Sequence, residues 1–309
     1  MLIKILILFA GNIAATSSIF MIRASELAPG YLAAYRLFLA VLILTPLWFR
    51  DMKSLSAHGH TNKHGSRHGG PAFLVRHCAP AGMFLGIHFV LWNNAAPLTL
   101  AANATLLVNM VALFMPVVMF VITREGPHKS EVLATALAFA GMILLTFGDI
   151  SLGGKYLRGN IYAFISMLFV TVYLALSRKN KSLPFWYYIG GVYFFGAVTS
   201  FLISFLSGAA LWTDRGLVEI LPVLGLTLIP TLLGHSLMNW SMRHISSQLV
   251  SVSLLTQTLW SGILAWLIYG ELPQPLFYPS AGLIILGMVI IAFTHHKIDM
   301  EEKHADSLS

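Results

Sequence analysis

Four histidines stand close together in the stretch HGHTNKHGSRHGG, residues 58–70: His58, His60, His64 and His68. Imidazole suits zinc and nickel, and short histidine-rich tracts are a compositional sign of metal binding. Glycine and polar residues surround these histidines, which is also typical of a solvated loop that binds nothing. Of the two alternatives, a metal-binding loop and a solvated polar connection, we favour the second.

A second group of chemically useful residues lies inside long apolar segments, at spacings that put side chains on one face of a helix. Amides, hydroxyls, imidazoles and indoles could hold the polar and apolar parts of a small solute. Hydrogen bonding between packed helices is the alternative for each of them. We predict that these residues line a central cavity: Asn12, Thr16, His88, Trp92, Asn109, Tyr173, His235, Asn239, Gln257 and Trp260.

The clearest of these faces lies within 247–269, where Ser253, Thr256, Gln257 and Trp260 follow the spacing i, i+3, i+4, i+7. A spacing of four joins the residues of the other faces: Asn12 with Thr16, His88 with Trp92, Thr105 with Asn109, and Thr231 with His235 and Asn239. Polar side chains are costly in lipid and usually face a cavity or another helix.

Composition defines the environment that positions these residues. The chain has 309 residues, of which 57% are hydrophobic and 10% are charged, whereas soluble domains are about 25% charged. The longest polar stretches, 50–71 and 297–309, are too short to bury a core. We therefore predict an all-α polytopic membrane protein. The single cysteine, Cys78, excludes an intramolecular disulfide framework.

Ten apolar runs are long enough to cross the hydrocarbon core, which takes roughly 17–25 residues. Short stretches with turn residues, such as ELAPG, NNAAP and ELPQP, separate them. We number the spans 1 to 10 and place them at 3–22, 31–49, 73–92, 99–123, 131–148, 159–177, 185–207, 217–241, 247–269 and 276–294.

Lysine and arginine are unevenly distributed between the two ends of these spans. With the N-terminus inside, 14 of them fall on the inner side, 4 on the outer side, and Arg36 lies within a span. The positive-inside rule therefore predicts that both termini and the histidine-rich loop are cytoplasmic. The same distribution explains the net charge of +7 without a nucleic-acid partner.

The segments 124–144 and 270–290 indicate an internal repeat. Four identical pairs are each separated by 146 positions: Glu125 and Glu271, Pro127 and Pro273, Gly141 and Gly287, and Met142 and Met288. A unit of five spans ends on the opposite side of the membrane from its start, so its copy is inserted upside down. Inverted repeats are a common transporter architecture, with the substrate site near the midplane between the halves.

Three segments carry a distinctive combination of residues: ELAPGYLAAYRLFLAVLIL, AANATLLVNMVALFMPVVMFVITREGP and SQLVSVSLLTQTLWSGILAWLIYGELP. They include an arginine early in span 2, Arg36, and a start of span 4 rich in Asn and Ala. Gly270 and Glu271 end span 9, whereas Glu125 ends span 4 without a preceding glycine. In this combination the chain resembles the drug/metabolite transporter superfamily, EamA type.

The resemblance covers nearly the whole chain and implies ten helices in two inverted five-helix repeats in a bacterial inner membrane. It places the first repeat at 1–148, with the histidine-rich loop at 54–71, the second at 149–296, and a cytoplasmic tail at 297–309. It implies a secondary transporter that works by alternating access and moves small organic metabolites, amino acids or related compounds, with export expected over import. The lipid bilayer and a small organic solute are then its partners, and a homodimer is left open.

The histidine-rich loop is not part of the family pattern. A divalent metal-ion transporter, or a metal-regulated permease that uses this loop, therefore stays as the alternative function. A metal path would need clustered ligands within the spans, and only His88 and His235 are available there. We expect no metal at the cavity.

The motif residues themselves are interpreted as structural. Arg36 lies about two turns into span 2, and we expect its side chain to snorkel to the outer interface, toward Glu26. Attraction of an anionic solute is the alternative role for this arginine. Glu125, Gly270 and Glu271 lie at span ends, where capping or turn contacts explain them.

Other classes of protein lack their signatures in this chain. No HExxH, GxSxG or GxxxxGK[ST] motif is present, so we expect neither an enzyme, a cofactor nor an ATP-driven pump. No carboxylate lies in the middle of a span to carry protons. Coupling through His88 or His235, exchange, and uncoupled transport are the alternatives, and a small-molecule sensor with the same fold also stays open.

Overall fold

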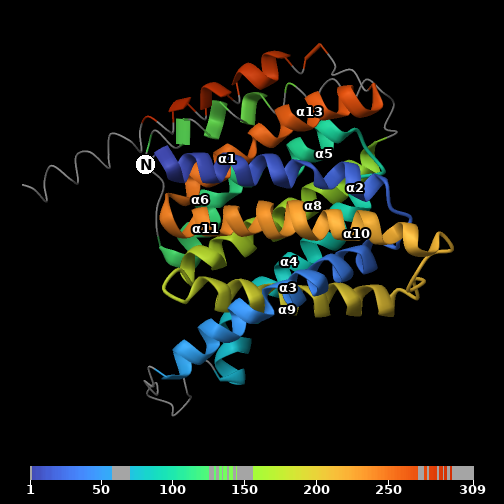
Figure 1. Cartoon of the computed structure of the whole chain (residues 1–309). Helices are drawn as coiled ribbons and strands as arrows, with labels where there is room; N and C mark the ends of the chain where they lie inside the picture. Colours follow the sequence, from blue (N-terminus) through green and yellow to red (C-terminus); the bar gives the residue numbers. More distant parts are fainter. Residues whose placement is uncertain are drawn as a thin grey trace, which may run out of the picture.

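The computed structural model shows the chain as a bundle of long helices that run roughly along one direction (Figure 1). All elements among the described residues are helical, which confirms the all-α prediction. In the hydrocarbon core a helix satisfies its own backbone N–H and C=O groups without water. The structure describes residues 2–57, 70–124, 129, 132–133, 135–137, 139–141, 144, 156–270, 275–276, 278–283, 285–287, 289–290 and 293.

Eight described segments are long and apolar enough to cross a membrane, and they correspond to spans 1–4 and 6–9. They consist of α1 (Leu2–Thr16) with α2 (Ser18–Arg23), α3 (Pro29–Ala57), α4 (Pro71–Ala95), α5 (Ala101–Val108) with α6 (Val111–Thr123), α8 (Leu157–Lys179), α9 (Phe185–Leu206), the run η1 (Gly216–Glu219), α10 (Ile220–Leu226), η2 (Thr227–His235) and α11 (Ser236–His244), and α12 (Ser247–Leu254) with α13 (Thr256–Tyr269).

Spans 5 and 10 are described in part, as helical residues between 129 and 144 and between 278 and 293. Both lie along the upper edge of the bundle in Figure 1. Val132, Leu133 and Phe293 expose more than half of their surface there. Apolar side chains on such an edge suit contact with lipid.

Span 2 is longer than its apolar run. We predicted its end at residue 49, but α3 continues to Ala57. The added residues, RDMKSLSA, include charges but neither glycine nor proline. Hydropathy indicates whether a segment lies in lipid or in water, but a helix continues wherever its residues have adequate helix propensity. The helix therefore extends beyond the apolar run.

Four spans are interrupted, which the periodicity of the sequence did not reveal. Span 1 breaks at Ser17, span 4 at Asn109 and Met110, and span 9 at Leu255. Within span 8, the segment Thr227–His235 is a π-helix that contains Pro230. Single π-helical turns are rare and frequently occur at functional sites.

The second half of the chain is inverted relative to the first. The Arg23 guanidinium donates to the carbonyls of Ala96 and Thr99, just before α5, and also lies 5.5 Å from the ring centroid of Tyr269, the last residue of α13. The start of span 4 and the end of span 9 are therefore at the same end of the bundle. The two spans run in opposite directions, as an inverted repeat requires.

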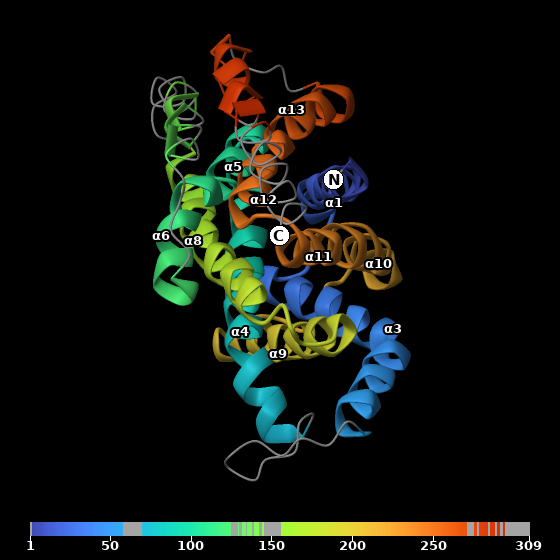
Figure 2. The ribbon, with the colours of Figure 1, turned by 90° about the vertical axis from the view of Figure 1, so that its left-hand side faces the viewer.

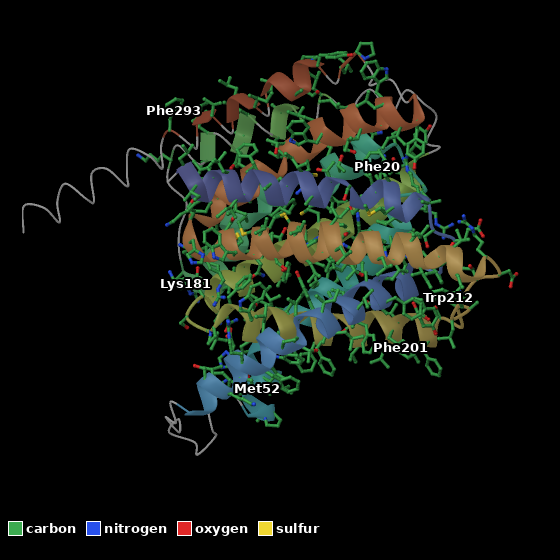
Figure 3. All side chains as sticks on the ribbon, viewed as in Figure 1. Phe20, Met52, Lys181, Phe201, Trp212 and Phe293 are labelled. Carbon is green, nitrogen blue, oxygen red and sulfur yellow. The ribbon has the colours of Figure 1, made fainter. Side chains whose placement is uncertain are left out.

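Lys181 and Trp212 mark the two ends of the bundle. Lys181 lies at the end where the chain starts, and Trp212 lies at the opposite end (Figure 3). The Lys4 ammonium donates to the carbonyl of His244 at 3.3 Å, which holds the start of span 1 beside the end of span 8. That this lysine-bearing end faces the cytoplasm stays a prediction of the positive-inside rule.

The ends of spans 4 and 9 share an unusual backbone conformation. Arg124 caps α6 with φ 65° and ψ 14°, and Gly270 caps α13 with φ 66° and ψ 15°. These positions are 146 apart, as are the repeated residues that follow them. Arg124 is the one non-glycine residue with positive φ in the described part of the chain. The two turns share one geometry, although arginine occupies one and glycine the other.

Glycines bring α4 and α9 into close contact across the two halves. A Cβ atom at Gly82 would lie 2.6 Å from the carbonyl oxygen of Val192, and one at Gly86 would lie 2.6 Å from that of Gly196. The spacing of Gly82 and Gly86 is the small-xxx-small pattern that lets membrane helices approach each other. Packing between the halves therefore depends on these residues lacking side chains.

Replacement of Arg124 by glycine should stabilise the protein. A residue with a Cβ costs about 1–2 kcal/mol in the left-handed region, so Arg124→Gly should raise the melting temperature in detergent by roughly 2–4 °C. Gly270→Ala should lower it for the same reason. Arg124→Ala is the matched control, since it removes the side chain but keeps the Cβ, and it should give no gain. An equal gain from Arg124→Ala would show that the side chain, and not the backbone, carries the cost.

Candidate functional site

A small cavity of about 40 Å³ lies between the two halves of the bundle. Helices α1, α4, α5, α8, α11 and α12 all contribute lining residues, and Figure 2 shows these helices seen along the bundle. Both halves contribute to its wall, as predicted for an inverted repeat. The lining residues are Ala15, Ser18, His88, Trp92, Thr105, Val108, Asn109, Val111, Val170, Leu174, His235, Met238, Leu254 and Gln257.

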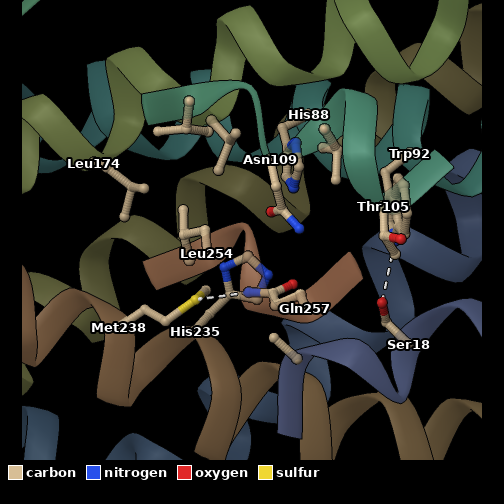
Figure 4. Close-up of a pocket in the computed structure, with 14 residues that line it drawn as sticks. Ser18, His88, Trp92, Thr105, Asn109, Leu174, His235, Met238, Leu254 and Gln257 are labelled. Atoms are coloured by element: carbon tan, nitrogen blue, oxygen red, sulfur yellow. Dashed lines mark hydrogen bonds between the residues drawn. The ribbon is translucent and has the colours of Figure 1, made fainter. Parts of the chain in front are cut away.

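Half of the predicted cavity residues line this space: His88, Trp92, Asn109, His235 and Gln257. His88 and Asn109 come from the first half and His235 and Gln257 from the second, and the four side chains point toward one another (Figure 4). Each is at most 7% exposed. The breaks in spans 4 and 9 and the end of the π-helix place Asn109, Gln257 and His235 beside the cavity.

Equivalent positions of the two halves face each other across the cavity. Val108 and Leu254 are 146 positions apart, as are Val111 and Gln257, and all four line the space. A pseudo-twofold relation between the halves therefore passes through the cavity. Its wall is chemically asymmetric, because the second half has an amide where the first has a valine.

Two polar atoms of the cavity lining have no hydrogen-bond partner among the described residues: Nδ2 of Asn109 and Nδ1 of His235. Leaving a buried polar group unpaired costs about 1–3 kcal/mol. Such groups are expected where water or a ligand completes the pairing. A cavity of about 40 Å³ has room for water, which needs roughly 10–15 Å³ by this measure.

Asn12 and Thr16 lie behind the cavity wall and not in it. The Asn12 amide donates to the carbonyl and the hydroxyl of Ser253, at 3.0 and 3.1 Å, and accepts from Nε2 of Gln257 at 3.4 Å. Thr16 donates to the carbonyl of Asn12. These contacts join span 1 to span 9 and orient Gln257.

His88 and Trp92 are held by serines that the sequence analysis did not single out. Nδ1 of His88 lies 2.7 Å from Oγ of Ser166 in α8, and the same hydroxyl contacts the carbonyl of His88 at 3.0 Å. The Trp92 indole donates to Oγ of Ser18 at 3.2 Å. A serine within a membrane helix carries no signal that distinguishes such a partner from a packing residue.

Tyr173 and Asn239 form a separate buried network. The Asn239 amide donates to the Tyr173 hydroxyl at 2.9 Å and accepts from Oγ of Ser177 at 2.7 Å. Neither side chain lines the cavity, and neither does Trp260, which is 38% exposed. Thr231, His235 and Asn239 were predicted to share one helix face. In the structure, Thr231 contacts Arg36, His235 lines the cavity, and Asn239 contacts Tyr173.

The prediction that the Arg36 side chain snorkels to the outer interface is wrong. The side chain is fully buried, and Nε donates to Oγ1 of Thr231 in the π-helix at 2.8 Å. Glu26, its expected partner, instead lies 3.8 Å from Arg215. The Arg36 guanidinium stacks on the ring of Phe89, with Cζ 4.0 Å from the centroid.

Apolar members of the lining were not predicted either. Met238, Leu254, Val170 and Leu174 complete the wall, but an apolar residue in an apolar span gives no sequence signal. The Met238 sulfur accepts a contact from Nε2 of Gln257 at 3.6 Å. Sulfur and aliphatic groups make part of the wall suited to an apolar moiety.

The described part of the chain contains no group of three His, Cys, Asp or Glu residues that could hold a metal ion. The rings of His88 and His235 are 6.0 Å apart, and no carboxylate lies with them in the cavity lining. His58, His60, His64 and His68, as well as Glu125 and Glu271, lie outside the described residues.

The Asn12 contacts should be measurable as a coupling between spans 1 and 9. Asn12→Ala and Ser253→Ala should each lower the melting temperature in detergent, and the double variant should lose less than the sum of both. We expect a coupling free energy of about 0.6 kcal/mol, typical of hydrogen bonds in membrane proteins. Strict additivity would contradict this contact.

The chain is similar to known proteins over almost its whole length. The sequence matches the EamA-like transporter family over residues 1–147 and again over residues 157–293. No curated protein matches. A crystal structure titled only as that of a protein, 17% identical, superposes with a TM-score of 0.69 over 96% of this chain and 98% of the other, and so shares the fold. The chain belongs to the EamA-like transporter family, in which the two matched segments are its two repeats.

Proposed function

We propose that the protein is a secondary transporter that exports small organic metabolites, amino acids or related compounds, across a bacterial inner membrane. The observation that carries this proposal is the cavity between the two repeats, where Asn109 and His235 present unpaired polar atoms beside an apolar wall. A solute with both polar and apolar groups matches such a lining.

Transport requires this cavity to expand. A volume of about 40 Å³ holds water but is smaller than a metabolite needs, so in this proposal the repeats separate before the solute is bound. In alternating access, the repeats rock against each other around the site. The contacts that join the halves, such as the close approach of α4 and α9, then act as the packed surfaces about which they move.

The amide residues of the cavity give the first test. Asn109→Ala and Gln257→Ala should each reduce transport at least about tenfold, because each removes a hydrogen-bonding group that faces the solute. Both variants should insert normally. The assay is resistance of cells to a panel of toxic amino-acid analogues and other metabolites, with the amount of membrane-inserted protein measured alongside.

Asn94→Ala is the matched control. The Asn94 amide donates to the carbonyl of Val90 in its own helix and does not line the cavity, so transport should be unchanged. Normal transport by both cavity variants would remove Asn109 and Gln257 from the site. If no compound in the panel distinguishes cells with and without the protein, the proposed substrate class fails.

The same assay with metal salts tests the alternative function, a divalent metal-ion transporter or a metal-regulated permease. Zinc, nickel and cobalt salts should give the same response with and without the protein, and changing His58, His60, His64 and His68 to alanine should leave resistance to organic compounds intact. A metal response that this change abolishes would assign the loop to the transport path.

A further inference from the structure

The Arg36 guanidinium is a buried cation without a counter-charge among the described residues. Nε donates to the neutral hydroxyl of Thr231 at 2.8 Å, but Nη1 and Nη2 have no hydrogen-bond partner there. Arginine stays protonated in proteins. An unpaired buried charge costs several kcal/mol, so the fold retains this residue against a substantial penalty.

Three other arginines among the described residues, each at least partly buried, show what a structural role looks like. Arg23 donates to the carbonyls of Ala96 and Thr99, and Arg178 to those of Met242 and Ile245. Arg243 donates to the carbonyls of Asn180, Lys181 and Leu183. Each of these three side chains donates hydrogen bonds to two or more backbone carbonyl oxygens at helix ends or in loops, whereas the Arg36 side chain donates to no backbone oxygen among the described residues.

No described carboxylate neutralises Arg36. The buried acid of the described chain, Glu219, pairs with Arg215 at 3.2 Å and accepts from the Ser25 hydroxyl and the Glu26 backbone N–H. The ion pairs within the described ranges leave Arg36 out. Among the described residues, Arg36 therefore has no negative charge beside it.

Two rings separate Arg36 from the cavity: Phe89, which does not line it, and His235, which does. The Arg36 guanidinium covers one ring, Phe89, and the same ring meets His235 edge-to-face at 4.8 Å between centroids. Nδ1 of His235 and Nδ2 of Asn109 are unpaired on the cavity side. Around this part of the site the unsatisfied groups of Arg36 and Asn109 are all N–H donors, which call for a ligand rich in acceptor oxygens.

We propose that Arg36 is the anion subsite of the transporter and binds the carboxylate of the transported solute through Nη1 and Nη2. This inference rests on the proposed function and narrows its substrate class to compounds with a free carboxylate. The planar fork of arginine matches both oxygens of a carboxylate. Expansion of the cavity has to move the Phe89 ring aside so that the carboxylate reaches the guanidinium.

The experiment uses the purified full chain in detergent and compares matched ligands by thermal shift. Each L-amino acid is paired with its carboxamide, which keeps the side chain and the amino group but removes the negative charge. We expect at least one amino acid to stabilise the wild-type protein, with an apparent affinity at least about tenfold greater than that of its carboxamide, as a charged hydrogen bond predicts.

Variants then assign the effect to Arg36. Arg36→Gln should reduce the affinity for the amino acid to that for the carboxamide, and Arg36→Lys should retain part of the preference. Arg23→Gln is the matched control, since it also removes a partly buried arginine but should leave the preference intact. Size-exclusion profiles identify any variant that fails to fold, and if Arg36→Gln does so, the comparison of amino acid and carboxamide is made with Arg36→Lys.

Several outcomes would overturn the inference. These are an equal response to amino acids and carboxamides, stabilisation by chloride or phosphate but by no carboxylate, no response to any member of the panel, and an unchanged preference in a folded Arg36→Gln. If the cell assay shows transport of neutral compounds and the thermal shifts with amino acids and carboxamides are equal, the proposed function stands but Arg36 has no part in binding the solute. No transport of any kind would instead remove the proposed function itself.

Discussion

The absence of water from the hydrocarbon core is the constraint on which this structure depends. Each backbone N–H and C=O must be paired within the protein, which is why the described spans are helices. Breaks in a helix at this depth are tolerated where protein or a cavity takes up the freed groups. The interruptions at Ser17, Asn109 and Leu255 and the π-helix that ends at His235 all contain or adjoin residues of the cavity lining. The spans without breaks, α3, α4, α8 and α9, form the frame around them.

Duplication explains the arrangement of the site but not its chemistry. The 146-residue offset relates Val108 to Leu254 and Val111 to Gln257, so both copies contribute the same positions to one cavity. Because the copies are no longer under identical constraints, one presents an amide where the other presents a methyl-bearing side chain. A symmetric frame with an asymmetric lining can bind an asymmetric solute.

The architecture was largely predictable from sequence because it follows from apolar runs and from the repeat. The cavity was predictable in part. His88 and Gln257 were expected from the cost of polar groups in lipid, but the same argument selected Asn12 and Asn239, whose amides serve other helices. Spacing defines a helix face but not which neighbour that face meets. Arg36 shows the same limit: its distance from the span end suggested the interface, whereas the packing of α3 on the π-helix buries it.

The buried charge of Arg36 has a consequence for the membrane that the protein occupies. A membrane that stores energy as a potential must be insulated, since each elementary charge that crosses it dissipates about 2.3 kcal/mol per 100 mV. A cavity of about 40 Å³ has room for only a few water molecules, so protons find few sites for transfer. A fixed positive charge next to it raises the electrostatic barrier for hydronium and metal cations, as arginines do in other selective pores. The residue that we assign to anion recognition would thus also keep the empty transporter from leaking.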